Sequence, residues 1–151
     1  MSTATISTST TPTLIDARGP RFAAVITTLV LALALVFQSP LAIIFQLVVF
    51  ATGALLGPQK TMYSTIFRSV VKPRLKGEVP TEDVRPPQFA QRVGFAFALV
   101  ATLGLVASST ITFTIATSFA LAAAFLNAAF NFCLGCEIYL LITRLRNRPT
   151  A

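Results

Sequence analysis

Two cysteines and a glutamate form the densest group of reactive side chains in this sequence. Cys133 and Cys136 are the only cysteines of the chain, and Glu137 is the only acidic residue inside a long apolar run. A cysteine pair at this spacing is typical of thiol redox chemistry or soft-metal binding, and the alternative is two small side chains that fill apolar gaps. Glu137 could accept a proton from a reacting thiol. The three residues are therefore the predicted catalytic unit of a redox or sulfur site.

Two asparagines are predicted to support this unit. Asn127 and Asn131 lie four positions apart, so on a helix they form an amide face close to that of Glu137. The alternative is that these amides and Glu137 only hold neighbouring helices together through hydrogen bonds.

Other kinds of site find less support in the sequence. A metal at Cys133 and Cys136 would need more ligands than the chain displays, because it has no histidine, although a homodimer could supply four thiolates. The absence of histidine also excludes a serine triad, and no glycine-rich phosphate loop is present. We expect no cofactor and no nucleic-acid partner.

The elements that position these residues are predicted to be membrane-spanning helices. The chain of 151 residues is 54% hydrophobic and only 11% charged, which lies outside the range of soluble globular proteins. Residues 22–59 carry no charge, and residues 93–143 carry only Glu137. About 20 residues cross the hydrocarbon core, so each block folds back as a hairpin of two helices. The predicted fold is an all-α membrane protein with four transmembrane helices, at about residues 22–37, 41–56, 89–107 and 111–143.

Arginine and lysine are distributed on one side of the predicted bundle. The formal net charge is +7, and cations precede the first block, separate the two blocks and follow the second, whereas both hairpin turns are uncharged. The positive-inside rule then places both termini and the middle loop in the cytoplasm. The predicted location is the cell membrane, with several spans and with anionic lipid as a partner.

The segments outside the spans have simpler predicted roles. Residues 1–17 are predicted to be a disordered cytoplasmic tail, residues 18–146 the transmembrane domain and residues 147–151 a second tail. Residues 59–71 place apolar side chains at helical spacing and predict one interfacial helix on the inner leaflet. Residues 72–87 form an irregular, proline-rich loop where a soluble partner would dock.

The predicted fourth span places the cysteine pair inside the membrane. Counted back from Arg144 along one continuous helix, Glu137 lies about 10 Å deep and Cys133 about 16 Å deep. Thiolates are favoured at helix N-termini and beside cations, so a pair in mid-helix beside a carboxylate is not expected to be strongly activated. With a cytoplasmic partner, we expect the pair to be reduced at rest.

A short sequence echo precedes the two hairpins. Residues 18–23 and residues 85–90 both follow the pattern Arg-x-Pro-x-Phe-Ala. A duplication would produce two parallel repeats related by an axis along the membrane normal. The alternative is that proline followed by phenylalanine is a convenient start for a transmembrane helix.

Four segments together resemble a bacterial membrane family known only as domain of unknown function 4395. They are RGPRF at residues 18–22, GP at 57–58, RPPQFAQ at 85–91 and CLGCEIY at 133–139, and the resemblance covers about residues 14–146. It implies a small multi-span membrane protein and transfers no catalytic role. It also points to a thioredoxin-like protein or a sulfurtransferase as a cytoplasmic partner.

The chain is also similar to quinone-coupled disulfide-forming enzymes, including relatives of vitamin K epoxide reductase. Those enzymes act at the outer face of the membrane. Cys133, however, follows the predicted outer turn by more than 20 residues, which places it toward the cytoplasm. Oxidation of exported proteins is therefore disfavoured.

Three classes of function remain open from the sequence. The first is thiol redox or sulfur handling through Cys133, Cys136 and Glu137, in a monomer or a homo-oligomer. The second is a non-catalytic membrane scaffold or partner subunit, and a soft-metal-binding membrane protein is the third. The sequence leaves open whether the chain is an enzyme.

Overall fold

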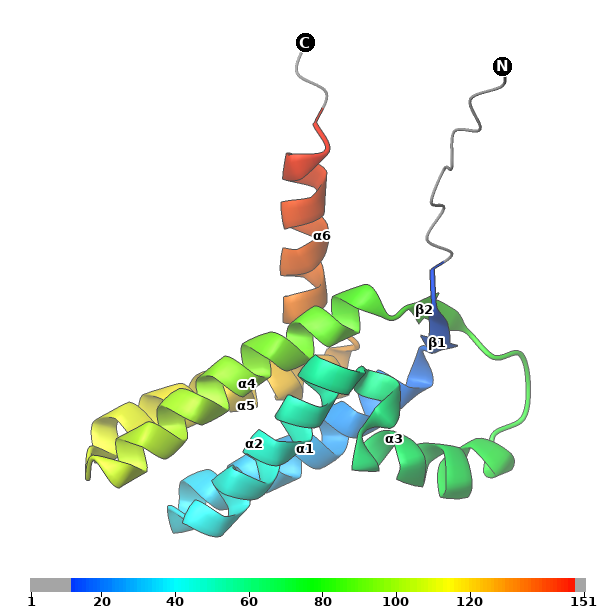
Figure 1. Cartoon of the computed structure of the whole chain (residues 1–151). Coiled ribbons are helices and arrows are strands. Elements are labelled where there is room, and N and C mark those ends of the chain that lie inside the picture. The colour runs from blue at the N-terminus through cyan, green and yellow to red at the C-terminus, as the bar shows by residue number, and fades with distance from the viewer. Residues whose placement is uncertain (1–11, 149–151) are drawn as a thin grey trace, which may run out of the picture.

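The computed structural model describes residues 12–148, and its architecture is all-α with one small two-stranded sheet. Short 3₁₀ and π turns surround the third helix. The helices and strands, labelled in Figure 1, are β1 (Leu14–Asp16), α1 (Arg18–Phe37), α2 (Pro40–Leu56), α3 (Met62–Ile66), β2 (Thr81–Asp83), α4 (Arg85–Val106), α5 (Thr110–Phe130) and α6 (Leu134–Arg146).

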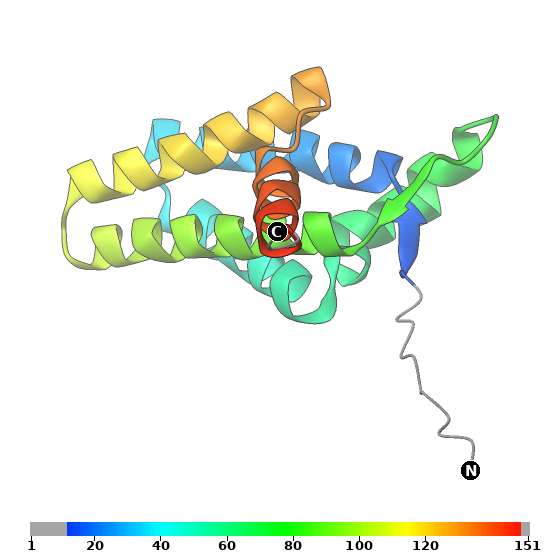
Figure 2. The same cartoon turned by 90° about the horizontal axis from the view of Figure 1, so that it is seen from above.

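Four long helices form the body of the molecule. Seen from above, α1 lies beside α5 on one side and α2 lies beside α4 on the other (Figure 2), in agreement with the contacts between these pairs. Alanine is frequent in the core, because small side chains let helices approach closely where lipid supplies no hydrophobic drive. The core residues are Leu31, Ala34, Ile43, Phe50, Ala98, Ala101, Phe113, Ala116 and Ala120.

Serine side chains begin the helix after each tight turn between two long helices. Ser39 accepts a hydrogen bond from the backbone N–H of Ala42 at the start of α2. Ser109 accepts one from Thr112 at the start of α5. Such caps satisfy N–H groups that have no partner inside the helix. Both turns are therefore specified locally.

Three of the helices, α1, α4 and α5, are long and apolar enough to cross a membrane, and α2 is apolar but has 17 residues. Large apolar side chains cover the outside of the bundle; Leu41, Leu55 and Val106, for example, are each about 80% exposed. Such a surface is far more apolar than a soluble monomer tolerates. Length and surface together agree with a multi-pass membrane protein.

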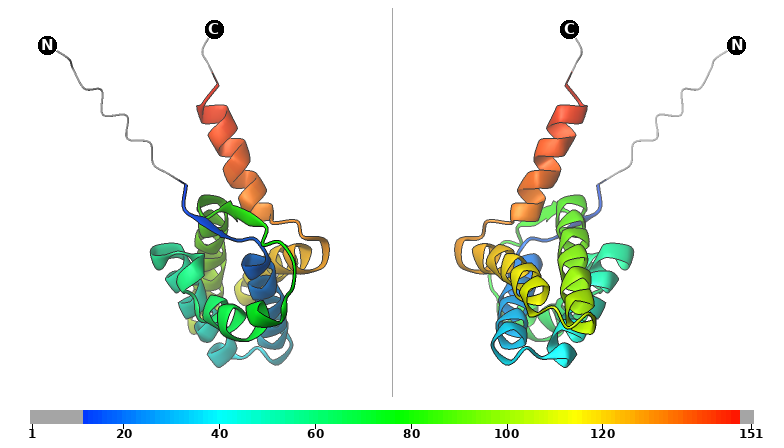
Figure 3. Two further views of the ribbon diagram at one scale, coloured as in Figure 1. Left: turned by 90° about the vertical axis from the view of Figure 1, so that its right-hand side faces the viewer. Right: turned by 90° about the vertical axis from the view of Figure 1, so that its left-hand side faces the viewer.

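The prediction of one continuous helix over residues 111–143 is wrong. α5 ends at Phe130, and α6 begins at Leu134 and points away from the bundle in Figures 1 and 3. Asn131 between them has a left-handed backbone (φ 53°) and its N–H bonds back to the carbonyl of Leu126. Asparagine tolerates this conformation better than most residues. Hydropathy does not register the break, because all residues around it are uncharged.

The end of the predicted N-terminal tail is ordered. Residues 14–16 form β1, which pairs antiparallel with β2 in the loop before α4. The prediction of disorder over residues 1–17 therefore fails for this strand, because a partner strand distant in sequence completes its hydrogen bonds. The remainder of that tail up to residue 11, and residues 149–151 of the predicted C-terminal tail, lie outside the described residues.

The predicted interfacial helix is a series of short turns. Residues 58–74 contain α3, a π turn and two 3₁₀ turns in place of one helix. Met62, Ile66 and Val70 are exposed, as expected for a face toward lipid. Phe67, which the sequence placed on the same face, instead packs on Phe22 with the ring centroids 5.7 Å apart.

A buried polar chain ties this segment to the bundle. The Tyr63 hydroxyl donates to Gln46 Oε1 at 2.8 Å, and Gln46 Nε2 donates to the hydroxyl of Thr27 at 3.4 Å. All three side chains are buried. Gln46 therefore faces neighbouring helices and not the outside of the bundle.

An aspartate follows each strand and binds the arginine two positions later. Asp16 accepts from the backbone N–H and the guanidinium of Arg18, and Asp83 accepts in the same way from Arg85. The hydrogen bond from the guanidinium lowers the pKa of each carboxyl. The pairs therefore fix the chain direction at the starts of α1 and α4.

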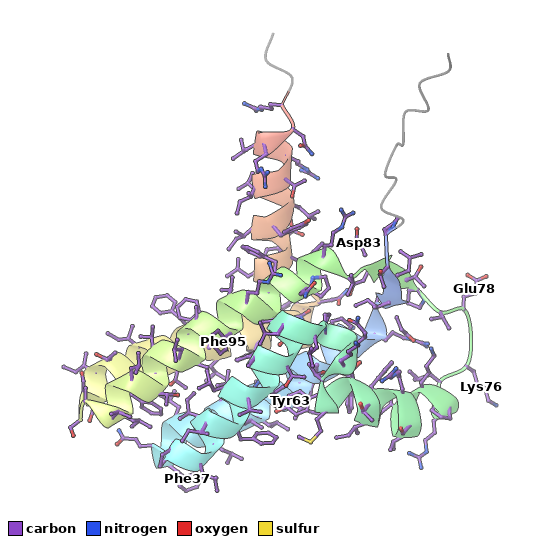
Figure 4. All side chains as sticks on the ribbon, viewed as in Figure 1. Phe37, Tyr63, Lys76, Glu78, Asp83 and Phe95 are labelled. Atoms are coloured by element: carbon purple, nitrogen blue, oxygen red, sulfur yellow. A yellow bond between two sulfur atoms is a disulfide. The ribbon has the colours of Figure 1, made fainter. Side chains whose placement is uncertain are left out.

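Asp16→Asn should destabilise the protein in a pH-dependent way. The folded-state pKa of Asp16 lies below its ordinary value near 3.8, so its contribution is complete above that value and is lost as the pH falls through the folded-state pKa. We expect a loss of at most about 1 kcal/mol in the free energy of unfolding at neutral pH, because solvent screens this ion pair, and the loss shrinks in acid. Thermal unfolding in detergent at several pH values measures it. Glu78→Gln, in the exposed loop of Figure 4, is the control and should have no effect.

Candidate functional site

The chain reversal after α5 places both cysteines at the start of α6. Cys133 has an extended backbone and is the N-cap residue, and its sulfur accepts a hydrogen bond from the N–H of Cys136 at 3.3 Å. Cys136 and Glu137 lie in the first turn. The prediction that the pair lies in mid-helix is therefore wrong. The N–H groups and the dipole at a helix start favour a thiolate at Cys133.

Cys133 and Cys136 are joined by a disulfide, with their Cα atoms 5.2 Å apart. This separation lies within the ordinary range for disulfides. An extended residue followed by one helical turn brings the two sulfurs together. The sequence predicted a reduced pair at rest, and the structure has the oxidised form. In this form the pair can accept two electrons.

A cavity of about 380 Å³ brings together all five residues predicted for the site. Cys133, Cys136, Glu137, Asn127 and Asn131 all line it. The expectation that these side chains gather in one place therefore agrees with the structure, although they belong to two helices rather than one.

Three charged residues that sequence reasoning missed line the same cavity. They are Arg21 from the start of α1, and Glu82 and Asp83 from β2. The available signal was the repeated Asp-x-Arg before each Arg-x-Pro-x-Phe-Ala, which marks two equivalent helix starts. The pairing of β1 with β2 carries Glu82 and Asp83 to the site.

The carboxyl groups of the cavity differ in their environment. Burial raises the pKa of Glu82 above its ordinary value near 4.5, because desolvation disfavours the charged form. The guanidinium of Arg85 lowers the pKa of Asp83. Arg21 donates to the carbonyl of Ala128 at 3.3 Å, near the end of α5. Glu82 and Glu137 are therefore the two carboxyls available for proton transfer near the disulfide.

A smaller, largely apolar cavity of about 100 Å³ lies between α1, α4 and α5. Alanine, glycine and proline supply most of its lining. Asn127 and Cys133 line this cavity as well as the larger one. The disulfide thus borders both the interior of the bundle and the cavity at its end.

The predicted depths of Glu137 and Cys133 in the membrane do not apply, because the helix is interrupted between α5 and α6. Counting back from Arg144 is valid only along one straight transmembrane helix, and α6 is a separate helix of 13 residues. Metal binding also gains no support, since residues 12–148 contain no group of three or more histidine, cysteine or acidic side chains that could hold an ion. The two sulfurs are bonded to each other.

The fold and the site define the class of this molecule. It is an all-α protein with three helices long and apolar enough to span a membrane and with a disulfide cavity at one end of its helices. The chain belongs to the family described as Domain of unknown function (DUF4395), which matches residues 15–144. The resemblance stated from the sequence motifs is thereby confirmed. Neither a curated protein nor a solved structure matches the chain.

Gly135→Ala should disturb the site through packing alone. A Cβ at Gly135 would lie 2.7 Å from the Cα of Ala90, so α6 would have to move away from α4. We expect a loss of about 1–3 kcal/mol in the free energy of unfolding and faster reduction of the disulfide by a small thiol. Thermal unfolding and timed alkylation measure the two effects. Leu141→Ala, on the exposed side of α6, is the matched control, and equal behaviour of the two variants would contradict the packing account.

Proposed function

We propose that this chain is a multi-pass membrane protein that exchanges electrons or sulfur with a cytoplasmic thiol protein through Cys133 and Cys136. The disulfide at the start of α6, within a cavity that also holds acidic side chains, carries this proposal. A thioredoxin-like protein or a sulfurtransferase is the proposed partner. The segment at residues 72–87, predicted as an irregular loop, contains β2 and the start of α4 in the structure, and it is the proposed docking region.

The proposed topology has four spans in two hairpins, α1 with α2 and α4 with α5. The 17 residues of α2 extend over about 25 Å, most of the hydrocarbon thickness. The pairing of β1 with β2 holds the starts of α1 and α4 at one end, next to most of the cations. This arrangement supports cytoplasmic termini and a cytoplasmic loop at residues 72–87.

α6 is proposed to lie along the inner membrane surface. Leu141, Ile142 and Leu145 are exposed on it, and Arg144 and Arg146 occupy its last turn. An apolar face with neighbouring arginines is typical of a helix at an anionic lipid surface. In that position the disulfide lies at the membrane boundary, within reach of a soluble protein.

The chemistry begins with the reduced pair and a partner disulfide. Glu137 takes the proton of Cys133. The Cys133 thiolate, stabilised at the start of α6, attacks one partner sulfur; the partner S–S bond breaks and a mixed disulfide forms on Cys133. Cys136 then attacks the Cys133 sulfur and passes its proton to the leaving partner thiolate, so that the partner is released as a dithiol. Two electrons pass to the partner. The same steps run in reverse from a reduced partner, with the direction set by the two reduction potentials.

Sulfur transfer would use the same nucleophile. The Cys133 thiolate attacks the outer sulfur of a partner persulfide, which leaves the partner as a thiolate and creates a persulfide on Cys133. Cys136 then resolves that persulfide by forming the disulfide and releasing sulfide.

A non-catalytic scaffold is the alternative function. The same disulfide closes the connection between α5 and α6, and a covalent link of this kind could serve only to hold α6 in place. The two functions differ in the reactivity that they require of Cys133.

Single cysteines should reveal the proposed topology. In a Cys133→Ser, Cys136→Ser background, Lys76→Cys should react with a membrane-impermeant maleimide only after the cells are opened. Ser109→Cys, in the turn between α4 and α5, should react in intact cells. Gel-shift labelling measures both. Labelling of Lys76→Cys from outside would overturn the orientation.

Cys136→Ser should trap a mixed disulfide or persulfide on Cys133, because the resolving thiol is lost. Glu137→Gln in this background should slow trapping by roughly 100-fold if it removes the proton acceptor. Non-reducing gels and mass spectrometry of the trapped species measure the effect. Cys133→Ser is the matched control and should trap nothing.

Glu82→Gln tests which of the two carboxyls near the disulfide, Glu82 or Glu137, accepts the proton. If Glu137 is the proton acceptor, Glu82→Gln should leave the trapping rate within about threefold of the parent. A larger effect would indicate that Glu82, in β2, is the proton acceptor. If neither cysteine traps a partner, and neither substitution changes any thiol-dependent phenotype, the scaffold function holds.

A further inference from the structure

The two strands are related to each other as a two-fold axis requires. Ile15 lies opposite Glu82, and the residues on either side pair crosswise. A rotation by 180° about an axis through the Ile15–Glu82 pair therefore places β1 on β2 and β2 on β1 with the same residue pairs. The aspartate that ends each strand also makes the same set of hydrogen bonds to the arginine two positions later.

The same two-fold relation holds for the long helices, with α1 corresponding to α4 and α2 to α5. α1 packs against α5 in one half, and α4 packs against α2 in the other. Arg21, in the first turn of α1, donates to the carbonyl of Ala128 at 3.3 Å. Gln88, at the corresponding place in α4, donates to the carbonyl of Ala54 at 3.1 Å. Each acceptor lies two residues before the end of its helix.

The correspondence continues into the segments after α2 and α5. Phe22 of α1 stacks on Phe67 with the ring centroids 5.7 Å apart, and Phe89 of α4 stacks on Tyr139 of α6 at the same distance. The interplanar angles are 43° and 47°. α3 with its following turn is thus the counterpart of α6.

The caps of these two segments match as well. The Thr61 hydroxyl accepts from the N–H of Ser64 at 3.2 Å at the start of α3. The Cys133 sulfur accepts from the N–H of Cys136 at 3.3 Å at the start of α6. Both caps have an extended backbone. Thr61 and Ser64 therefore stand in the first half where Cys133 and Cys136 stand in the second.

We propose that the chain is an internal duplication, with repeats at about residues 14–76 and 81–148, and that Thr61 and Ser64 occupy in the first repeat the positions that Cys133 and Cys136 occupy in the second. The Thr61 hydroxyl is buried and donates to the carbonyl of Pro58, so in the first repeat this position closes a turn. Hydroxyl groups cannot pass electrons, and the redox chemistry of the second repeat therefore has no counterpart in the first. This chemical comparison rests on the proposed function.

The surroundings of the two pairs of positions support this correspondence. Ser64 lines a cavity of about 290 Å³ that also contains Asp16, and Cys136 lines the disulfide cavity, which also contains Asp83.

The test moves the thiols to the first repeat. In the full chain with Cys133→Ser and Cys136→Ser, Thr61→Cys and Ser64→Cys are introduced together, changes that add little volume. The protein is equilibrated in mixtures of reduced and oxidised glutathione, in which each disulfide formed yields two molecules of glutathione thiol. Alkylation and mass spectrometry measure the fraction closed. Met62→Cys with Thr65→Cys, one position further along, is the matched control.

The 61/64 pair should close with an equilibrium constant within roughly tenfold of that of the native pair, and the 62/65 pair should close at least about tenfold more weakly than the 61/64 pair. If the 61/64 pair closes no better than the control, the duplication is overturned. If the native pair itself does not close, the proposed function fails, while the comparison of 61/64 with 62/65 still decides the duplication. Superposition of the two repeats in an experimental structure gives a readout independent of thiol chemistry.

Discussion

The pairing of β1 with β2 is the constraint on which the rest of the structure depends. Three residues on each side fix the starts of α1 and α4 next to each other, although 67 positions separate Asp16 from Asp83 in the chain. The disulfide cavity takes Arg21 from α1, Glu82 and Asp83 from β2, and its asparagines from the end of α5. Without the strand pairing, these groups would have no common location.

Hydrogen bonds hold the helices where burial of apolar surface gives little drive. The chain from Tyr63 through Gln46 to Thr27 joins α3, α2 and α1 inside the bundle. Gln88 joins the start of α4 to the end of α2. In a lipid environment such bonds and close packing of small residues replace the hydrophobic effect as the source of helix association.

The chemistry of the cysteine pair depends on one local backbone change. A helix interior offers no free N–H groups, whereas a helix start offers several, together with the positive end of the dipole. Because Asn131 has a left-handed backbone and ends α5, the cysteines lie at the start of a new helix and not in a helix interior. The same change turns α6 away from the bundle and exposes its apolar face. The proposed reactivity of Cys133 and the position of α6 therefore both follow from a single break in the helix.

Much of the fold and part of the site could be predicted from the sequence. The uncharged blocks, the serine-capped turns and the positions of α1, α2 and α4 follow from composition and local spacing, and the five predicted site residues do line one cavity. These features depend on residues close together in the chain.

Only the tertiary structure decided where the fourth long helix ends and that Leu14–Asp16 is a strand. It also decided that Arg21 and Glu82 line the same cavity as the disulfide. Hydropathy is the same for a straight helix and a broken one when all residues at the break are uncharged. Strand pairing between distant segments leaves no periodic pattern in three residues. Local sequence thus determined which elements form, and contacts between distant segments determined where their ends meet and what surrounds the sulfur atoms.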